Sequence, residues 1–339
     1  MRRLLFGLAV LTAPASAALA GEDGLDCATA PEPVISLSYV SRYADDDASR
    51  ATIDPLREAE AEAALAPLDA FILTLAEKVD GMYSGPLKSR PKAANCILDQ
   101  LFAWAQVDAL SELETQTVRL TVGARYAAFA LILWQTLPYA YEHPARDDIA
   151  AWLERRVREQ MGFWPDAPEG ARQGNLRAWA GLAAAALSVQ SGDEDVMDWA
   201  EMAISDVMCS ANSDGSLPQE MSRGRLALHY QLHAIAPLVT AAALLERQGI
   251  AVSDTCDGAL HRIVSFAVSD LDDGAKTRRI TGFAQNLFED DETLERFQLA
   301  WMEPYLALKH DDDLATMAEE MRPLSYSKLG GNQTALWGK

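Results

Sequence analysis

The sequence of 339 residues lacks the short motifs that mark several large enzyme classes. It contains no G-x-G-x-x-G and no G-x-x-x-x-G-K-[ST] stretch, in which backbone N–H groups would hold the phosphates of a nucleotide. It also contains no H-E-x-x-H zinc motif and no G-x-S-x-G nucleophile elbow. Nucleotide-dependent, zinc-dependent and serine-hydrolase functions therefore lack the residues they need, and we expect neither a cofactor nor a metal.

Histidine is scarce as well, and the five copies are His143, His229, His233, His261 and His310. His229 and His233 are four residues apart, a spacing at which two imidazoles on one helix can hold a metal ion. No carboxylate or third histidine lies at ligand spacing, so the pair does not predict a metal site. His233 also follows Tyr230 by three residues and shares its helix face, although a buried core histidine is the commoner role.

Long apolar runs are missing too, because no segment after the first twenty residues approaches the roughly 20 apolar residues that a membrane span needs. Those first twenty, MRRLLFGLAVLTAPASAALA, have a basic start, a short apolar run and an A-x-A pattern before Gly21. Residues 1–20 are therefore predicted to be a secretory signal peptide, and the mature protein to be periplasmic without membrane insertion. No Pro/Gly/Ser-rich linker divides residues 21–339, which favours a single domain.

Positive charge is in short supply. The chain has 29 Lys and Arg against 50 Asp and Glu, which gives a formal net charge of -21 at pH 7. Loss of Arg2 and Arg3 with the signal peptide makes the mature protein more acidic still. Such a body repels nucleic acid at long range, so nucleic acid is not an expected partner. A polyanionic substrate would need a local basic patch.

The four cysteines are Cys27, Cys96, Cys209 and Cys256, and none forms a C-x-x-C motif. An even number in an oxidising compartment predicts two disulfides, for which four cysteines allow three connectivities. We favour Cys27–Cys96 with Cys209–Cys256, although the cysteine positions alone allow the other two connectivities as well. Buried free thiols are the alternative.

The chain is predicted to be all-α, because apolar residues recur at three- and four-residue steps from Pro55 onward. Before that point, only Val34–Val40 has the character of a strand. The expected helices are Pro55–Val79, Ala93–Leu110, Glu114–Thr136, Asp147–Glu159, Leu176–Gln190, Asp193–Cys209, Gly224–Arg247, Asp257–Ser269 and a short one within Trp301–Leu308. Helices with short connections suit antiparallel hairpins closed into a barrel or toroid, although periodicity equally allows an open solenoid.

Two stretches carry candidate chemistry. In DGSLPQEMSRGRLALHYQLHAIAP, Arg223 and Tyr230 are seven residues apart, so on one helix they would share a face as a reaction centre. A surface arginine beside a half-buried tyrosine is the alternative. Asn175 precedes an Ala-rich helix and reads first as its N-cap. Residues 41–50 read as a mobile acidic loop flanked by Arg42, Tyr43 and Arg50, with plain solvation as the alternative.

Seven pieces of this sequence together resemble the periplasmic alginate lyases, poly(β-D-mannuronate) lyases of polysaccharide lyase family 5. They are SLSYVSRYADDDASRATID, CILDQLFAWAQVDAL, GNLRAWAG, DGSLPQEMSRGRLALHYQLHAIAPL, GALHRIVSFAVSDLDD, AWMEPYLAL and KLGG, in the order and at about the spacing of that family. The resemblance implies an incomplete α/α toroid with a deep cleft under a lid loop. It also implies the Cys27–Cys96 disulfide.

The resemblance implies β-elimination on a polyuronate, in which a base removes the C5 proton and an acid protonates the departing O4. Arg223 and Asn175 would bind the carboxyl group, and Tyr230 would be acid and base. Because a free phenol has a pKa near 10, Tyr230 would need a neighbouring cation, Arg223 or Arg225, to favour its phenolate.

The same resemblance gives the expected partner, an acidic polysaccharide, and the residues that would touch it. Arg42 and Tyr43 match the basic and aromatic lid residues that meet the sugar chain. Arg42, Arg50, Arg177 and Arg225 would form the local basic patch. The oligomeric state is open, with a monomer favoured.

Two positions depart from the family pattern. Gly174-Asn175-Leu176 stands where the family has Asn-Asn-His, so the histidine is a leucine here. His233 stands where the family has a tyrosine, and it is a hypothesis that His233 partly replaces the lost histidine. The alternative function is therefore a catalytically weakened homologue that binds an acidic exopolysaccharide.

Overall fold

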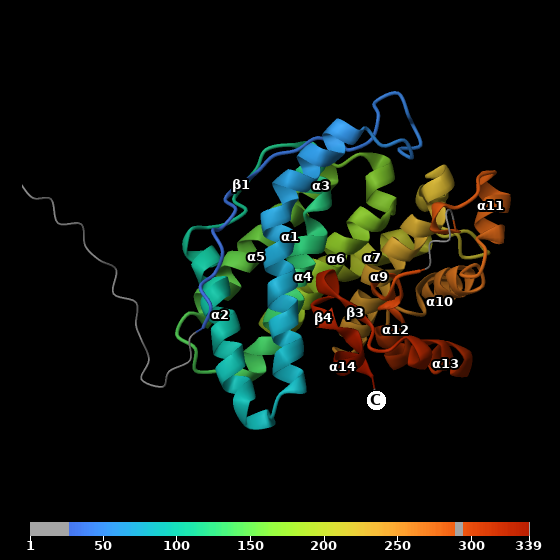
Figure 1. Ribbon diagram of the computed structural model, residues 1–339. Coiled ribbons are helices and arrows are strands. Elements are labelled where there is room, and N and C mark those ends of the chain that lie inside the picture. Colours follow the sequence, from blue (N-terminus) through green and yellow to red (C-terminus); the bar gives the residue numbers. More distant parts are fainter. Residues whose placement is uncertain (1–26, 289–293, 339) are drawn as a thin grey trace, which may run out of the picture.

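The computed structural model describes residues 27–288 and 294–338, and Figure 1 shows them as a body built of helices. The predicted signal peptide, residues 1–20, lies outside the described residues. The helices are α1 (Pro55–Ser84), α2 (Arg90–Gln106), α3 (Gln116–Thr121), α4 (Gly123–Thr136), α5 (Arg146–Phe163), α6 (Asn175–Ser191), α7 (Glu194–Cys209), α8 (Pro218–Met221), α9 (Ala227–Glu246), α10 (Thr255–Val268), α11 (Ala275–Thr281), α12 (Met302–Leu308), α13 (Asp312–Met321) and α14 (Gln333–Trp337).

Strands are minor in the described residues. β1 (Ser36–Leu37) pairs in parallel with β2 (Glu112–Leu113), and β3 (Ser325–Tyr326) pairs antiparallel with β4 (Gly331–Asn332). The strand expected over Val34–Val40 is thus reduced to two residues. The all-α prediction is confirmed.

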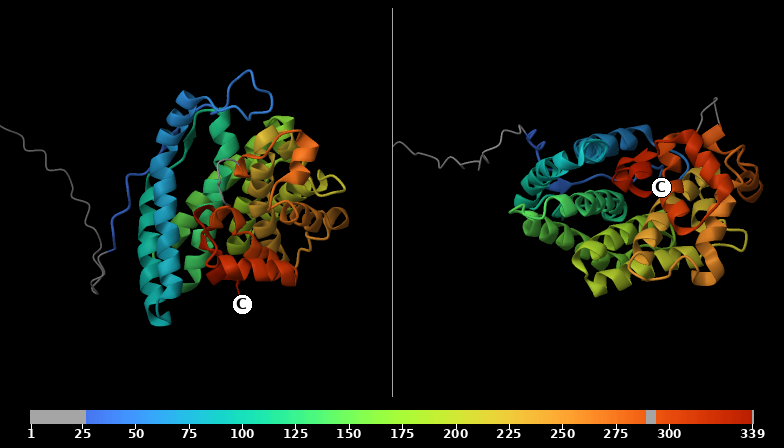
Figure 2. Two further views of the ribbon diagram at one scale, coloured as in Figure 1. Left: turned by 45° about the vertical axis from the view of Figure 1, so that its right-hand side comes forward. Right: turned by 90° about the horizontal axis from the view of Figure 1, so that it is seen from below.

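The helices follow one another around the molecule in sequence order, as the view from below in Figure 2 shows. α1 and α2 form a hairpin on one side, and α10 to α13 lie on the other. The C-terminal segment returns to α1, where the Asn332 backbone N–H donates to Asp80 Oδ1 at 2.7 Å. The helices thus follow the chain order around a ring, and the C-terminal segment meets α1. Antiparallel helix hairpins give this arrangement when they close into a barrel or toroid.

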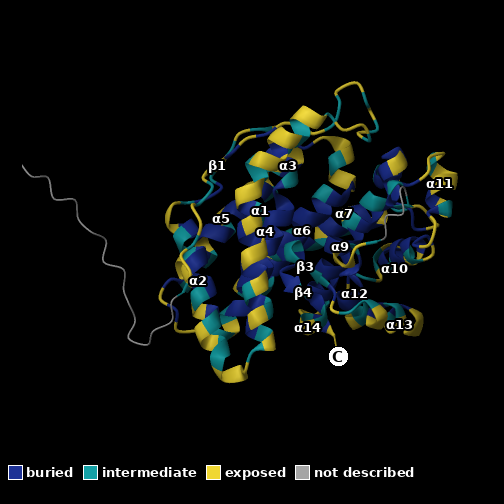
Figure 3. Ribbon diagram, in the orientation of Figure 1, coloured by how far each residue is buried: buried dark blue, intermediate teal, exposed yellow. Residues whose placement is uncertain are grey.

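α4, α6 and α9 form the centre of the body, and Figure 3 shows them buried while the outer face of α1 is exposed. α6 is rich in alanine, which lets neighbouring backbones come close. At Gly123 an added Cβ would lie 3.0 Å from the Ala180 backbone nitrogen, so α4 and α6 need glycine at this crossing. The segment Gly224–Glu246 is apolar and long enough to cross a membrane, but 83% of its apolar 18-residue window is buried inside the fold.

Several expected helices differ from the structure in their extent. Pro55–Val79 continues to Ser84, and Ala93–Leu110 begins at Arg90 and ends at Gln106. Glu114–Thr136 is divided into α3 and α4 at Val122. Thr115 caps α3 by accepting a hydrogen bond from the Val118 backbone N–H at 3.2 Å, which fixes the start two residues later than predicted. Residues of both α3 and α4 line the cleft described below.

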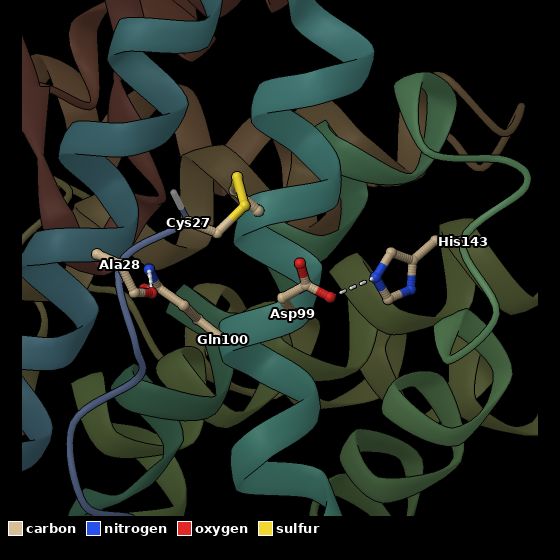
Figure 4. The surroundings of a disulfide bond; sticks show 6 residues. Cys27, Ala28, Asp99, Gln100 and His143 are labelled. Carbon is tan, nitrogen blue, oxygen red and sulfur yellow. Dashed lines mark hydrogen bonds and ion pairs between the residues drawn. A yellow bond between two sulfur atoms is a disulfide. The ribbon is translucent and has the colours of Figure 1, made fainter. Parts of the chain in front are cut away.

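Both favoured disulfides, Cys27–Cys96 and Cys209–Cys256, are present. Figure 4 shows the first, which ties the N-terminal segment to α2. Beside it Gln100 Nε2 donates to the Ala28 carbonyl at 2.8 Å. Cys209 is the last residue of α7 and Cys256 lies at the start of α10, so the second disulfide joins these two helices. Cross-links over 69 and 47 residues reduce the entropy of the unfolded chain.

Candidate active site

A cleft of about 380 Å³ opens between the N-terminal loop, α1, α3, α4, α6, α9 and β3. It is lined by six of the side chains singled out from the sequence, together with the leucine that replaces the family histidine. These residues are Arg42, Tyr43, Arg50, Asn175, Arg223, Tyr230 and Leu176. His233 lines it as well. The fold therefore brings side chains from the N-terminal loop, α6 and α9, which are far apart in the sequence, to one site.

Arg223 lies between two tyrosine rings. Its guanidinium carbon is 3.9 Å from the centroid of Tyr230 and 4.7 Å from that of Tyr43. The two phenol hydroxyls are hydrogen-bonded to each other, and Arg223 Nη2 donates to the Arg50 carbonyl at 2.5 Å. A guanidinium stacks well on aromatic faces and holds its donors in a fixed plane.

Arg223 and Tyr230 do not belong to one continuous helix as predicted. A 3₁₀ turn, Gly224–Leu226, separates Arg223 from α9, and Gly224 has a φ of +57°. The turn changes the direction of the chain, so the arginine folds back over the tyrosine ring instead of lying two turns below it. The two side chains meet by this route, which spacing alone did not indicate.

The Tyr230 hydroxyl is held in its protonated form. Burial raises the pKa of Tyr230 well above its usual value, and the Tyr43 hydroxyl raises it further. Arg223 and Arg42 lower this pKa, but they do not offset the burial. The expectation that a neighbouring arginine would favour the phenolate is therefore not met while Tyr43 covers Tyr230.

Asn175 is the first residue of α6, and the N-cap position belongs to Gly174. The N-cap role expected for Asn175 is thus wrong. Its backbone N–H donates to Glu220 Oε1 at 2.7 Å, and its Nδ2 lies 3.1 Å from each Glu220 oxygen. Asn175 Oδ1 is buried without a partner among the described residues, and so is Arg223 Nε. Buried polar atoms of this kind are costly unless a ligand or water meets them.

Glu220 was missed by the sequence reasoning. It is fully buried on α8, and burial raises the pKa of its carboxyl to about 7, while Asn175 and Arg223 act in the opposite direction. The signal available was its position three residues before Arg223, the spacing of neighbours on a helix. Near pH 7 this carboxyl is divided between a protonated and an ionised form.

Two histidines of α9 border the cleft. His233 Nε2 accepts a hydrogen bond from Trp179 Nε1 at 3.0 Å, and burial lowers its pKa well below the usual value. His229 lines the cleft beside Tyr230, with ring centroids 5.1 Å apart. Burial, Arg42 and Arg223 lower the pKa of His229 to about 4, so its imidazole is neutral at pH 7.

Lys328 is a further cation of the site, and the sequence analysis includes it only within the KLGG piece. It lines the cleft, and burial together with Arg125 lowers its pKa to about 8. Arg125 also lines the cleft, but its guanidinium is paired with Asp69 at 2.7 Å. The cleft is therefore positive inside a protein of strongly negative net charge.

Arg177 does not reach the cleft, so the substrate-binding role expected for it is corrected. It is buried with its guanidinium carbon 5.4 Å from the Trp164 ring and 5.0 Å from the Trp199 ring, and it bonds Asp206 at 3.3 Å. Successive residues of a helix are rotated by about 100°, so Arg177 points away from the side of Asn175.

Arg225 is exposed and lies outside the cleft as well. It borders a neighbouring hollow together with Thr52, Ile280 and Phe283. The basic patch inside the cleft is thus made by Arg42, Arg50, Arg223 and Lys328, without Arg177 and Arg225. In the parts of the chain that the structure describes, no group of three His, Cys, Asp or Glu side chains is placed to hold a metal ion.

Residues 41–54, called the lid here, border the cleft, and hydrogen bonds within the segment define its shape. Tyr43 and Ile53 form a β-bridge, and Asp54 N–H donates to the Arg42 carbonyl at 2.8 Å. Asp47 accepts bonds from the backbone N–H groups of Ser49, Ala51 and Thr52 at 2.7–2.9 Å. These hydrogen bonds hold the pKa of Asp47 well below its usual value, so it stays ionised.

Replacing Asp47 with alanine is expected to raise KM for a polyuronate about tenfold, because the lid then loses the geometry that places Tyr43 over Tyr230. The thermal midpoint should change little, since the residue lies on an exposed loop. Steady-state kinetics and a thermal melt check both points. Asp46→Ala, at the exposed neighbouring carboxylate, is the matched control. An unchanged KM in Asp47→Ala would show that lid order does not matter for binding.

Comparison with known proteins gives one consistent result. The alginate lyase family model matches residues 128–277. The alginate lyase of Pseudomonas syringae pv. syringae (strain B728a) is 25% identical over 334 residues, covering 96% of this chain and 86% of that protein. The alginate lyase of Azotobacter vinelandii is 28% identical over 321 residues, covering 92% and 84%.

Among solved structures, alginate lyase A1-III from Sphingomonas species A1 matches with a TM-score of 0.73 at 24% identity, over 94% of this chain and 88% of that chain. A variant of A1-III complexed with tetrasaccharide matches with a TM-score of 0.76 over the same shares. The predicted α/α toroid is thereby confirmed. The family-model match and the similarity to curated alginate lyases along nearly the whole sequence together show that this protein is similar to the alginate lyases.

Proposed function

We propose that this protein is a polysaccharide lyase that cleaves a β-1,4-linked polyuronate, mannuronate-rich alginate or a relative, by β-elimination. One observation carries the proposal: Arg223 is stacked on Tyr230 inside a positive cleft that also holds Asn175. A guanidinium can neutralise a uronate carboxylate, which makes the C5 proton acidic. The Tyr230 phenol lies directly beside this guanidinium, so both groups can contact the same sugar.

In the proposed reaction the substrate carboxyl binds to Arg223 and to Asn175 Nδ2, which exchanges a contact with Glu220 for one with the sugar. These donors stabilise the enolate-like charge as the C5–H bond breaks. Tyr230 takes the C5 proton as its phenolate and returns it to O4 as the C4–O4 bond breaks and the C4–C5 double bond forms. One residue can do both where the proton and the leaving group lie on the same face, as in mannuronate chains.

The lid gives Tyr230 a route to its phenolate. While Tyr43 is bonded to Tyr230, burial and the second phenol keep the pKa of Tyr230 high. A sugar that enters between the two rings would displace the Tyr43 hydroxyl, whereas Arg223 would stay against the Tyr230 ring. The remaining cation then favours the charged form.

The second candidate function is a weakened homologue that binds an acidic exopolysaccharide, and Leu176 favours it. Leu176 lines the cleft where the family pattern has a histidine, and its side chain can neither titrate nor donate a hydrogen bond. Loss of an acid or base costs about 10² to 10⁴ in rate. The Arg223–Tyr230 stack favours the enzyme, because binding alone does not require a phenol at this position.

Incubation with polymannuronate, polyguluronate and glucuronan separates the two functions. The lyase is expected to generate the ultraviolet absorbance of the unsaturated uronate, with the largest rate on polymannuronate. Measurable binding of these polymers without that absorbance would instead establish the binding protein. We further propose export to the periplasm, from the signal-peptide pattern of residues 1–20, and a monomeric state.

A further inference from the structure

Leu176 leaves the cleft one polar group short of the family pattern, and the facing helix offers a replacement. α6, which carries Leu176, packs directly against α9. We infer that His229 of α9 takes over this function: its neutral imidazole donates an N–H hydrogen bond to the carboxyl group that Arg223 neutralises. The inference rests on the proposed function and deepens it by assigning a residue that binds the substrate.

The position of His229 supports this assignment. Its half-buried ring borders the same cleft as Leu176, Arg223 and Tyr230. The His229 ring meets the Tyr230 ring edge to face, at 85° and 5.1 Å between centroids. A carboxylate bound at Arg223 and Tyr230 would therefore share one cleft with the His229 imidazole.

His229 is also free to act, whereas His233 is engaged. Within residues 27–288 and 294–338, neither ring nitrogen of His229 has a protein hydrogen-bond partner, and the residue lines the cleft. His233 already uses Nε2 to accept the Trp179 indole N–H, which fixes its ring. The hypothesis that His233 replaces the family histidine thus fits the geometry less well than the same role for His229.

The charges around the ring explain why the imidazole is a donor. Arg42 and Arg223 are the cations that act on His229, and together with burial they keep it uncharged. An uncharged imidazole avoids repulsion with both arginines and still carries one N–H. Neutral imidazoles that polarise a substrate oxygen are a known solution in enzymes that form enolates.

Four variants test the inference: His229→Ala, His229→Gln, the double variant Leu176→His/His229→Ala, and His310→Ala as the control. His310 is a histidine whose side chain is exposed. Two quantities are measured for each folded variant, kcat/KM on polymannuronate and the Kd of a saturated mannuronate oligosaccharide by calorimetry. Circular dichroism checks that each variant is folded.

His229→Ala is expected to lower kcat/KM about 10²-fold, the usual effect of removing one donor to a developing oxyanion. It should raise Kd about tenfold, as expected when one hydrogen bond to a charged group is lost. His229→Gln keeps an N–H donor that cannot titrate, so it should retain most of both quantities. The double variant should recover at least about tenfold of the kcat/KM that is lost, and the control should match the wild type.

Each result bears on the inference separately from the proposed function. A His229→Ala protein with wild-type kcat/KM and Kd overturns the inference and leaves the lyase intact. Equal losses in the Ala and Gln variants overturn the donor role, because a titrating base would be needed. A wild type that binds without cleaving refutes the lyase, and the Kd values then still decide the role of His229. A wild type that neither binds nor cleaves overturns both.

Discussion

Tyr230→Phe is expected to lower lyase turnover by about 10² to 10⁴, the range that general acid–base groups contribute. The substitution removes only the hydroxyl oxygen, so the ring that stacks under Arg223 remains. Substrate affinity should therefore stay close to that of the wild type, while kcat falls. A loss confined to kcat identifies a group that acts in the transition state.

Initial rates from ultraviolet absorbance and calorimetric binding of a saturated oligosaccharide separate these effects. Tyr141→Phe, at an exposed tyrosine, is the matched control and should behave as the wild type. The pH profile adds a second check, because the raised pKa of Tyr230 means that the base form grows as pH rises. Activity of the wild type should climb on the alkaline side. A Phe variant of near-normal rate would remove Tyr230 from the mechanism.

The all-α class was predictable from the sequence because its helices carry regular apolar periodicity, whereas the closed toroid was implied only by the family resemblance, since periodicity equally allows an open solenoid. Where prediction erred, a local polar contact or a close approach decided the structure. Thr115 caps α3, which therefore starts two residues later than expected, and Gly123, the first residue of α4, allows a close approach to the α6 backbone. The approach of Gly123 to Ala180 depends on residues distant in sequence, which periodicity does not report.

The site was predictable in its chemistry but less so in its geometry. Arg223 and Tyr230 meet as expected, yet through a 3₁₀ turn and not along one helix face. Arg177 was expected in the cleft, but the tryptophans on the other side of α6 stack on it. Glu220 and Lys328 lie within two of the matched pieces, but their residue types and spacing there did not mark them as part of the site, to which the fold brings them. The basic character of the cleft is thus a property of the fold more than of the local sequence.

Arg223→Lys should be nearly as damaging as Tyr230→Phe, with an expected loss of about 10² to 10³ in kcat/KM. The substitution keeps the positive charge, so any loss of kcat/KM reports the contribution of the planar guanidinium. That plane stacks on both Tyr43 and Tyr230 while one of its nitrogens donates to the Arg50 carbonyl. A lysine ammonium is a point charge on a flexible stem and cannot fill both roles.

Unlike the tyrosine variant, the lysine variant should lose affinity as well as rate, because the carboxylate is bound in the ground state and in the transition state. Kinetics on polymannuronate and calorimetry with an oligosaccharide measure the two losses. Arg279 is an exposed arginine on α11, and Arg279→Lys is the control for an arginine-to-lysine substitution outside the cleft. Full activity in Arg223→Lys would mean that charge alone suffices, and the stacked arrangement of Tyr43, Arg223 and Tyr230 would then have no part in neutralising the uronate.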